Sequence, residues 1–272
     1  MIANILSIAG SDPSGGAGIQ ADLKAISANG AFAMAALTAL TAQNTQGVHG
    51  IHIPPATFVK AQIDAVFADI DVHAVKIGMI ANAEIAAAVA QALMPHRGLP
   101  IVLDPVMIAK GGAPLLEEAA VETLRDALLP MATVITPNLP EAAYLLNQGT
   151  AQNRDDMVAQ GMALCALGPK AVLMKGGHLE GTQSPDCLVH EGGVYWLDAP
   201  RIATQNTHGT GCTLSSALAA QIPQQSCLLD AVSVAKSYVA SAIEAADQLS
   251  VGSGHGPTHH FANVDLKERS NL

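Results

Sequence analysis

The sequence predicts an α/β fold in which helices cover both faces of a central, mostly parallel sheet. Two observations carry this prediction. Short apolar runs of strand length alternate with longer segments of helical periodicity, and this alternation is typical of right-handed β-α-β crossovers. Half of the residues are apolar but only 3% are aromatic, so we expect a core of Ala, Ile, Leu and Val.

The expected elements follow one another through the chain. Strands are expected at residues 5–9, 74–77, 100–103, 133–135 and 171–174. Helices are expected after residue 18 and at residues 55–69, 82–94, 117–128, 139–146, 154–167, 210–220 and 226–249. The last helix is the clearest, because its apolar residues share one face and Ser226 can cap its first turn. A hairpin is expected across residues 186–198, around Gly192 and Gly193.

The length of 272 residues fits one large α/β domain, which we expect to span residues 1–264. The polar residues 265–272 are expected to form a flexible C-terminal tail.

Charge and cysteine content exclude several classes of function. A formal net charge of −10, with no run of Lys or Arg, argues against nucleic acid and anionic lipid as partners. The longest apolar run, residues 31–40, is too short to span a membrane, and no basic, apolar leader opens the chain, so a cytoplasmic protein is expected. The four cysteines form no C-x-x-C pair, which argues against a disulfide framework and a structural zinc site. The histidines near the C-terminus match no standard ligand spacing, so no metal site is expected among them.

The strongest functional motif is Thr-His-Gly-Thr-Gly-Cys-Thr at residues 207–213, which leads into an expected helix. Glycines at a helix start allow backbone N–H groups to converge on an anion, and the helix dipole adds positive potential. Such a cradle suits phosphoryl transfer, although an ordinary loop is the alternative. Cys212 is either a small packing residue or a thiol whose pKa the dipole lowers, so that its thiolate can accept a proton from a hydroxyl.

A second glycine-rich loop, residues 10–18, follows the first strand and opens the helix that carries Asp22. Ligands of open α/β sheets bind at the carboxyl ends of strands, which favours a binding role for this loop. The loop matches neither the Walker motif nor the dinucleotide fingerprint, so a structural turn is the alternative.

Polar side chains follow three further expected strands: Asp104, then Asn138 with Glu141, then Lys175. Because these strand ends share one edge of the sheet, Asn138 and Glu141 are candidate contacts for a hydrated magnesium ion, and Lys175 for a phosphate. Each residue alone is also explained by a helix cap or a solvated charge. Gln43 offers a donor and an acceptor that suit an aminopyrimidine edge, though a surface turn also explains it.

Together these motifs resemble those of the hydroxymethylpyrimidine and hydroxymethylpyrimidine-phosphate kinases, a family of the ribokinase-like superfamily. The matching segments are residues 9–18, 41–45, 76–79, 103–107, 136–141, 175–178, 206–213 and 256–261. The resemblance implies a ribokinase-like fold, a homodimer and two successive ATP-dependent phosphorylations. These convert 4-amino-5-hydroxymethyl-2-methylpyrimidine to its monophosphate and then to the diphosphate used for thiamine.

The resemblance also implies roles for individual residues. Cys212 would be the catalytic base, and the amides of Gly209, Gly211 and Cys212 would form an anion hole. The pyrimidine pocket would include Gly10, Ala17, Asp22, Gln43, Met79 and Val106. ATP and Mg²⁺ would be bound among Asp104, Asn138, Glu141, Lys175, Thr207, Gly209 and Gly211. Within that set, Asp104 and Glu141 would be the metal ligands, and Asp104 and Lys175 would join the catalytic residues.

Two alternatives remain at this stage. A pyridoxal or pyridoxine kinase is the nearest, because vitamin B6 also carries a hydroxymethyl group, whereas Gln43 favours the pyrimidine. A non-catalytic pyrimidine-binding sensor is the second, and the complete set of transfer residues argues against it. Residues 110–113, Lys-Gly-Gly-Ala, depart from the Ser-Gly pair more common in the family, which would alter a loop on the phosphate side.

Overall fold

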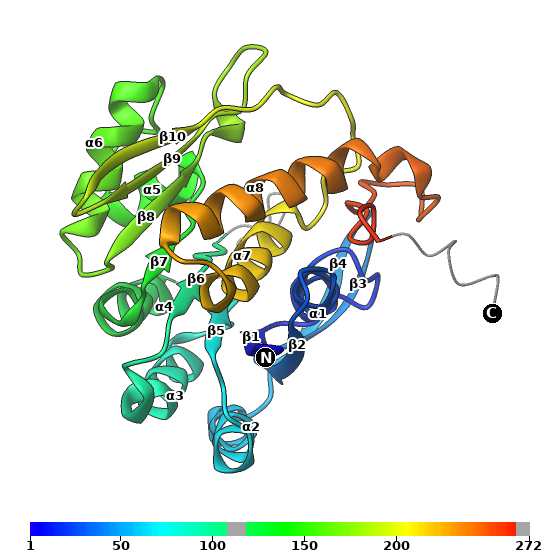
Figure 1. The fold of residues 1–272 in the computed structure, drawn as a ribbon. Coiled ribbons are helices and arrows are strands. Elements are labelled where there is room, and N and C mark those ends of the chain that lie inside the picture. The colour runs from blue at the N-terminus through cyan, green and yellow to red at the C-terminus, as the bar shows by residue number, and fades with distance from the viewer. Residues whose placement is uncertain (108–117, 265–272) are drawn as a thin grey trace.

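The computed structural model describes residues 1–107 and 118–264, and these build an eight-stranded sheet with helices on both faces (Figure 1). The strand order is β10-β9-β8-β7-β6-β5-β1-β2. The strands are β1 (Asn4–Ala9), β2 (Phe32–Leu37), β5 (Ala74–Ile77), β6 (Ile101–Leu103), β7 (Val134–Ile135), β8 (Ala171–Lys175), β9 (Asp186–His190) and β10 (Gly193–Leu197). Neighbours from β2 to β8 pair in parallel, whereas β8, β9 and β10 pair antiparallel. The predicted α/β fold with a mostly parallel sheet is confirmed.

The helices divide between the two faces of the sheet. One face carries α1 (Gly18–Ala28), α7 (Thr210–Gln221) and α8 (Leu228–Glu244), and the other carries α2 (Ala56–Asp69), α3 (Ala83–Leu93), α4 (Glu118–Thr123), α5 (Leu139–Leu146) and α6 (Arg154–Cys165). Short helical turns lie at Met94–His96, Leu124–Leu128, Leu129–Met131, Gly176–His178, Ile222–Gln224 and Ala246–Gln248. Alternate strand residues supply the two apolar layers, as the pleat of a strand requires.

A separate hairpin of β3 (Leu40–Asn44) and β4 (Gly47–His52) projects from this framework, and the sequence pattern does not predict it. The apolar run at residues 31–40 divides between β2 and the first residue of β3. The three alanines of β2 have low β-propensity, so the strand form of this segment depends on pairing with β1.

The start of α8 corrects one expectation. The helix begins at Leu228, and Cys227 rather than Ser226 is its N-cap, with Sγ accepting a hydrogen bond from the Asp230 N–H at 3.5 Å. Ser226 instead donates a hydrogen bond to the Asp230 carboxylate at 2.9 Å. The predicted hairpin of β9 and β10 is confirmed.

Two expectations fall on residues that the structure does not describe: the departure at residues 110–113 and the tail at residues 265–272. Within residues 1–107 and 118–264, no helix has both the length and the apolar character needed to cross a membrane.

Candidate active site

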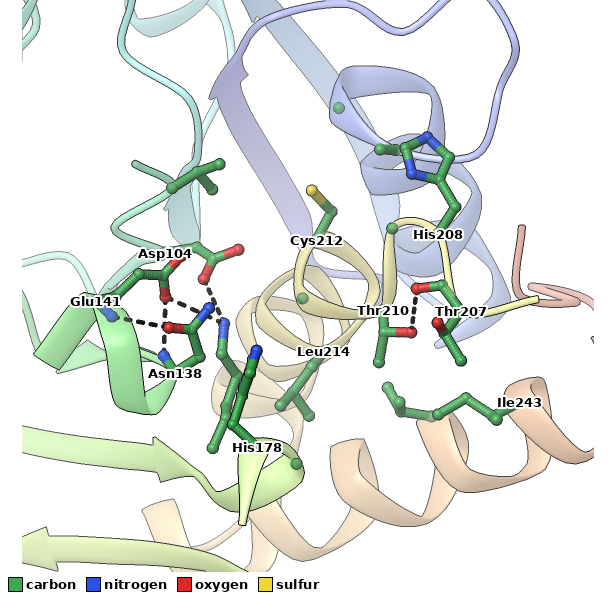
Figure 2. A pocket seen from close by; sticks show the side chains of 18 of the residues that line it. Asp104, Asn138, Glu141, His178, Thr207, His208, Thr210, Cys212, Leu214 and Ile243 are labelled. Carbon is green, nitrogen blue, oxygen red and sulfur yellow. Dashed lines mark hydrogen bonds and ion pairs between the residues drawn. The ribbon is translucent and has the colours of Figure 1, made fainter. Parts of the chain in front are cut away.

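The carboxyl ends of the parallel strands open into a cavity of about 960 Å³. Most of the residues singled out in the sequence line it: Gly10, Ala17, Gln43, Met79, Asp104, Val106, Asn138, Glu141, Lys175, Thr207, Gly209, Gly211 and Cys212. Figure 2 shows Cys212 between the cluster of Asp104, Asn138 and Glu141 on one side and His208 on the other. The fold therefore brings segments from both halves of the sequence into one site.

The first turn of α7 forms one wall of this cavity. Gly209 precedes the helix in a left-handed conformation (φ 75°), and a Cβ at this position would overlap the carbonyl oxygen of Gly16. The Thr213 N–H donates to the Gly209 carbonyl at 2.8 Å, which closes the first turn. The Thr210 N–H donates to the Thr207 carbonyl at 3.4 Å. The N–H groups of Gly211 and Cys212 have no carbonyl partner in a helix of this kind, so α7 presents these donors and the positive end of its dipole to the cavity.

The two glycine loops are joined by a hydrogen bond between His208 and Asp12 that sequence reasoning missed. His208 Nε2 lies 2.8 Å from Asp12 Oδ2, and the same carboxylate accepts hydrogen bonds from the N–H groups of Ala17 and Ser14, each at 2.9 Å. Burial opposes ionisation of Asp12, but the hydrogen bonds from His208, Ser14 and Ala17 together outweigh it and keep the pKa of the carboxyl below its ordinary value, so Asp12 is an anion. Both residues stand inside the quoted motifs, but only the tertiary structure reveals their pairing.

Lys175, at the end of β8, is held between two acidic residues. Its Nζ lies 2.9 Å from Asp104 Oδ1 and 3.8 Å from Glu141 Oε2. Asn138 caps α5 and shares a capping box with Glu141, in which both backbone N–H groups donate to the opposite side chain at 2.8 Å. Asn138 is thus a helix cap, which is the alternative explanation from the sequence, and its side chain also lines the cavity.

The acidic residues of this cluster differ in their protonation. At Asp104 burial opposes ionisation, but Lys175 and Lys76 outweigh it and hold the pKa of the carboxyl below its ordinary value. At Glu141 burial prevails over Lys175 and raises the pKa to about 7. Glu141 is therefore close to half protonated at neutral pH, and an approaching cation would favour its ionised form.

The expected lowering of the Cys212 pKa is wrong for the unliganded site. Burial raises the pKa of the thiol to about 11, and the carboxylates of Asp22 and Asp104 act in the same direction. Lys76 and a hydrogen bond with the backbone of Gly18 favour the thiolate but do not compensate for burial.

Gln43 lies on β3 rather than in a surface turn, and it lines the cavity with Gly10, Met79 and Val106. The strand is fixed to the first glycine loop, because Thr41 Oγ1 donates to the Ser11 carbonyl at 2.8 Å.

Asp22 is the exception among the predicted substrate contacts. It lies outside the cavity lining and is completely buried, where it binds Lys76 Nζ, Ser7 and Ser216. The predicted contact of Asp22 with the substrate has no support from the cavity lining and stays a prediction.

Among the histidines near the C-terminus, His260 belongs to the buried packing of the fold. His260 is buried with Nε2 3.1 Å from Thr213 Oγ1, its carbonyl accepts a hydrogen bond from Tyr238, and burial lowers its pKa to about 4. Within residues 1–107 and 118–264 no group of three His, Cys, Asp or Glu side chains is arranged to hold a metal by itself.

Comparison with known proteins identifies close relatives. A family model described as phosphomethylpyrimidine kinase matches residues 12–259. The hydroxymethylpyrimidine/phosphomethylpyrimidine kinase of Salmonella typhimurium is 54% identical over 258 residues, which cover 95% of this chain and 97% of that protein. The crystal structure of phosphomethylpyrimidine kinase from Clostridium difficile matches with a TM-score of 0.79 and 43% identity, over 89% of this chain and 99% of that one. An ADP complex of Bacillus subtilis pyridoxal kinase matches with a TM-score of 0.88 and 33% identity, over 97% and 99% of the two chains.

Replacement of Gly209 by alanine tests the contact between the glycine loops. Gly209→Ala should lower the free energy of unfolding by at least about 2 kcal/mol, because the left-handed backbone and the Gly16 carbonyl both oppose a Cβ. Urea unfolding followed by circular dichroism measures the change. Gly98→Ala is the matched control, since a Cβ there meets nothing within 4 Å. Equal stability of the two variants would contradict the contact.

Proposed function

The chain belongs to the phosphomethylpyrimidine kinase family, and we propose that Cys212 is the base in its phosphoryl transfer. The enzyme phosphorylates hydroxymethylpyrimidine and phosphomethylpyrimidine in thiamine biosynthesis, and pyridoxal kinases are more distant relatives. The observation that carries the proposal is the position of Cys212, in the first turn of α7 and in one cavity with Gln43 and Lys175. A cytoplasmic location, where thiols stay reduced, fits the four unpaired cysteines.

The geometry supports a division of the cavity into two halves. The pyrimidine would lie beside Gln43, which reads its amino edge, with Gly10, Ala17, Met79 and Val106 around it. The ATP phosphates would lie beside Lys175, Asn138 and Thr207 and receive the amides of Gly209, Gly211 and Cys212. Those amides are fixed before the reaction, so they stabilise charge on the transferred group without reorganisation.

In the first phosphorylation the hydroxymethyl oxygen attacks the γ-phosphorus of ATP while its proton passes to Cys212 Sγ. The bond between that phosphorus and the ADP oxygen breaks, and ADP leaves. In the second phosphorylation the acceptor is a phosphate oxygen, and a phosphate monoester has its second pKa near 6, so most acceptors are already ionised at neutral pH. Cys212 should therefore matter more for the first step than for the second.

Mg²⁺ fits the donor set on the phosphate side. Asp104 and Glu141 provide hard carboxylate oxygens, and Mg²⁺ is usually held by one or two carboxylates together with substrate phosphates and water. The pKa of about 7 at Glu141 fits a carboxylate that gains full charge when a cation binds. Bound there, Mg²⁺ would neutralise part of the charge on the ATP phosphates.

The Cys212→Ala variant tests the base. Turnover of the pyrimidine alcohol should fall at least about 100-fold, because proton transfer loses its acceptor, whereas turnover of the monophosphate should fall less. Products formed with ATP and Mg²⁺ are resolved by mass, with pyridoxal and pyridoxine as competing substrates. Cys227→Ala, at the exposed N-cap of α8, is the control. Unchanged turnover of the alcohol would remove Cys212 from the base role, and turnover of the B6 compounds alone would contradict the pyrimidine assignment.

We also propose that the enzyme is a homodimer that associates through the hairpin of β3 and β4. Leu40 and Ile51 lie exposed on the hairpin, and Ile53 and Phe58 are exposed just beyond it. Four large apolar side chains in one short stretch, outside the main sheet, are typical of an interface.

An acidic substitution in the hairpin tests this interface. Ile51→Asp should convert the dimer to a monomer, because a carboxylate in an apolar interface is costly to desolvate. Light scattering after size exclusion measures the mass, and Val234→Asp on α8 is the control at an exposed apolar position outside the hairpin. A dimer that persists in Ile51→Asp would place the interface elsewhere.

A further inference from the structure

We propose that Lys76 is a positioning residue for this reaction, and that its buried ammonium is the charge that allows Cys212 to become a thiolate. The inference rests on the proposed base role of Cys212. Lys76 and Cys212 line the same cavity, yet the side chain of Lys76 is completely buried. The sequence marks Lys76 only as one residue of a motif, without a role.

The pleat of β5 directs Lys76 toward Cys212. Val75 and Ile77 join the apolar layer beneath α2 and α3, whereas Ala74 joins the layer beneath α1, α7 and α8. Lys76 is two residues from Ala74, so it lies on the same face of the sheet. Because α7 packs directly on β5, this face meets the helix that carries Cys212.

Asp22 fixes the position of the Lys76 ammonium. Both of its carboxylate oxygens accept hydrogen bonds from Lys76 Nζ, at 2.9 and 2.8 Å. Ser7 donates to the same carboxylate at 2.6 Å, and Ser216 at 2.7 Å. Ser216 follows Cys212 by four residues on α7, so the two side chains lie on one face of the helix, one turn apart. Asp22 therefore joins the Lys76 ammonium to the face of α7 that carries Cys212.

A purely structural ion pair does not explain this arrangement well. Desolvation of two charges commonly costs as much as their attraction returns, and apolar residues of similar volume would fill the same space. Burial opposes the charge of Lys76, but its acidic neighbours, with Asp22 foremost, together outweigh burial and raise its pKa, so the lysine stays an ammonium through the working pH range. The structure thus maintains a positive charge at a costly position next to the reacting thiol.

Several groups act on Cys212 from the surrounding elements. Lys76 on β5 makes the largest contribution in favour of the thiolate, with help from the backbone of Gly18 at the start of α1. The carboxylates of Asp22 and Asp104 oppose it. Lys175, at the end of β8, also interacts with the thiol. Without Lys76, the main group that favours the thiolate is lost, while burial and the two carboxylates still raise the pKa of Cys212.

Lys76 itself exchanges no bond in the reaction. The proton leaves the hydroxymethyl oxygen and arrives on Cys212 Sγ, and it passes to solvent after the product departs. The thiolate must exist before this transfer, and the ammonium stabilises that anion through space.

The reactivity of Cys212 toward iodoacetamide measures the thiolate directly and without turnover. In the unliganded enzyme, alkylation of the Cys212 peptide is followed by mass spectrometry from pH 7 to 10. The rate should rise with pH, because the pKa of the thiol is about 11. In Lys76→Met the rate at pH 8 should fall at least tenfold. Lys76→Arg should keep most of it, and the control Lys60→Met, which removes an exposed lysine paired with Asp64, should match the wild type.

A second variant keeps the test valid if Lys76→Met folds poorly. Asp22→Asn combined with Lys76→Met removes both buried charges, and it should show a smaller fall in the same direction, because the loss of the ammonium outweighs the loss of the carboxylate. Turnover of the pyrimidine alcohol should show a lower kcat with little change in KM. An alkylation rate within twofold of the wild type in both variants would overturn the proposal. Failure of the base role itself would show separately, as unchanged turnover in Cys212→Ala.

Discussion

The contact between the two glycine loops determines where the chemistry of this enzyme takes place. Gly209 lies in a left-handed conformation against the carbonyl of Gly16, where no side chain fits. The pair of His208 and Asp12 holds the same two loops together. One loop follows β1, the neighbour of the edge strand β2, and the other begins α7, so this contact sets the first turn of α7, with its N–H groups and Cys212, against the cavity.

Burial is the second constraint on the site, and each charged group responds to it through its neighbours. The chain carries a formal net charge of −10, yet two lysines and a helix start bring positive potential to one edge of the sheet. The charge of Lys175 is paired with Asp104 and Glu141, and the charge of Lys76 is paired with Asp22. Burial keeps the pKa of the Cys212 thiol high, and Lys76 offsets this effect only in part.

The sequence predicts the parallel sheet, the order of its helices and most of the cavity lining, because apolar periodicity and strand-end motifs are local signals. The sequence does not predict features that depend on tertiary contacts. The strand form of β2 depends on pairing with β1, and the pair of His208 and Asp12 joins residues 196 positions apart. The direction of the Cys212 pKa depends on desolvation, which no spacing of residues reveals. Asp22 is likewise assigned to the substrate by motif, but the fold places it beneath the cavity.

The most direct test of this account is a crystal structure with the pyrimidine alcohol, Mg²⁺ and a non-hydrolysable ATP analogue bound together. The account predicts the hydroxymethyl oxygen within about 3.5 to 4 Å of Cys212 Sγ, the pyrimidine amino group on Gln43, and the γ-phosphate on the amides at the start of α7. A hydroxymethyl group turned away from Cys212, with the γ-phosphate bound elsewhere in the cavity, would contradict it.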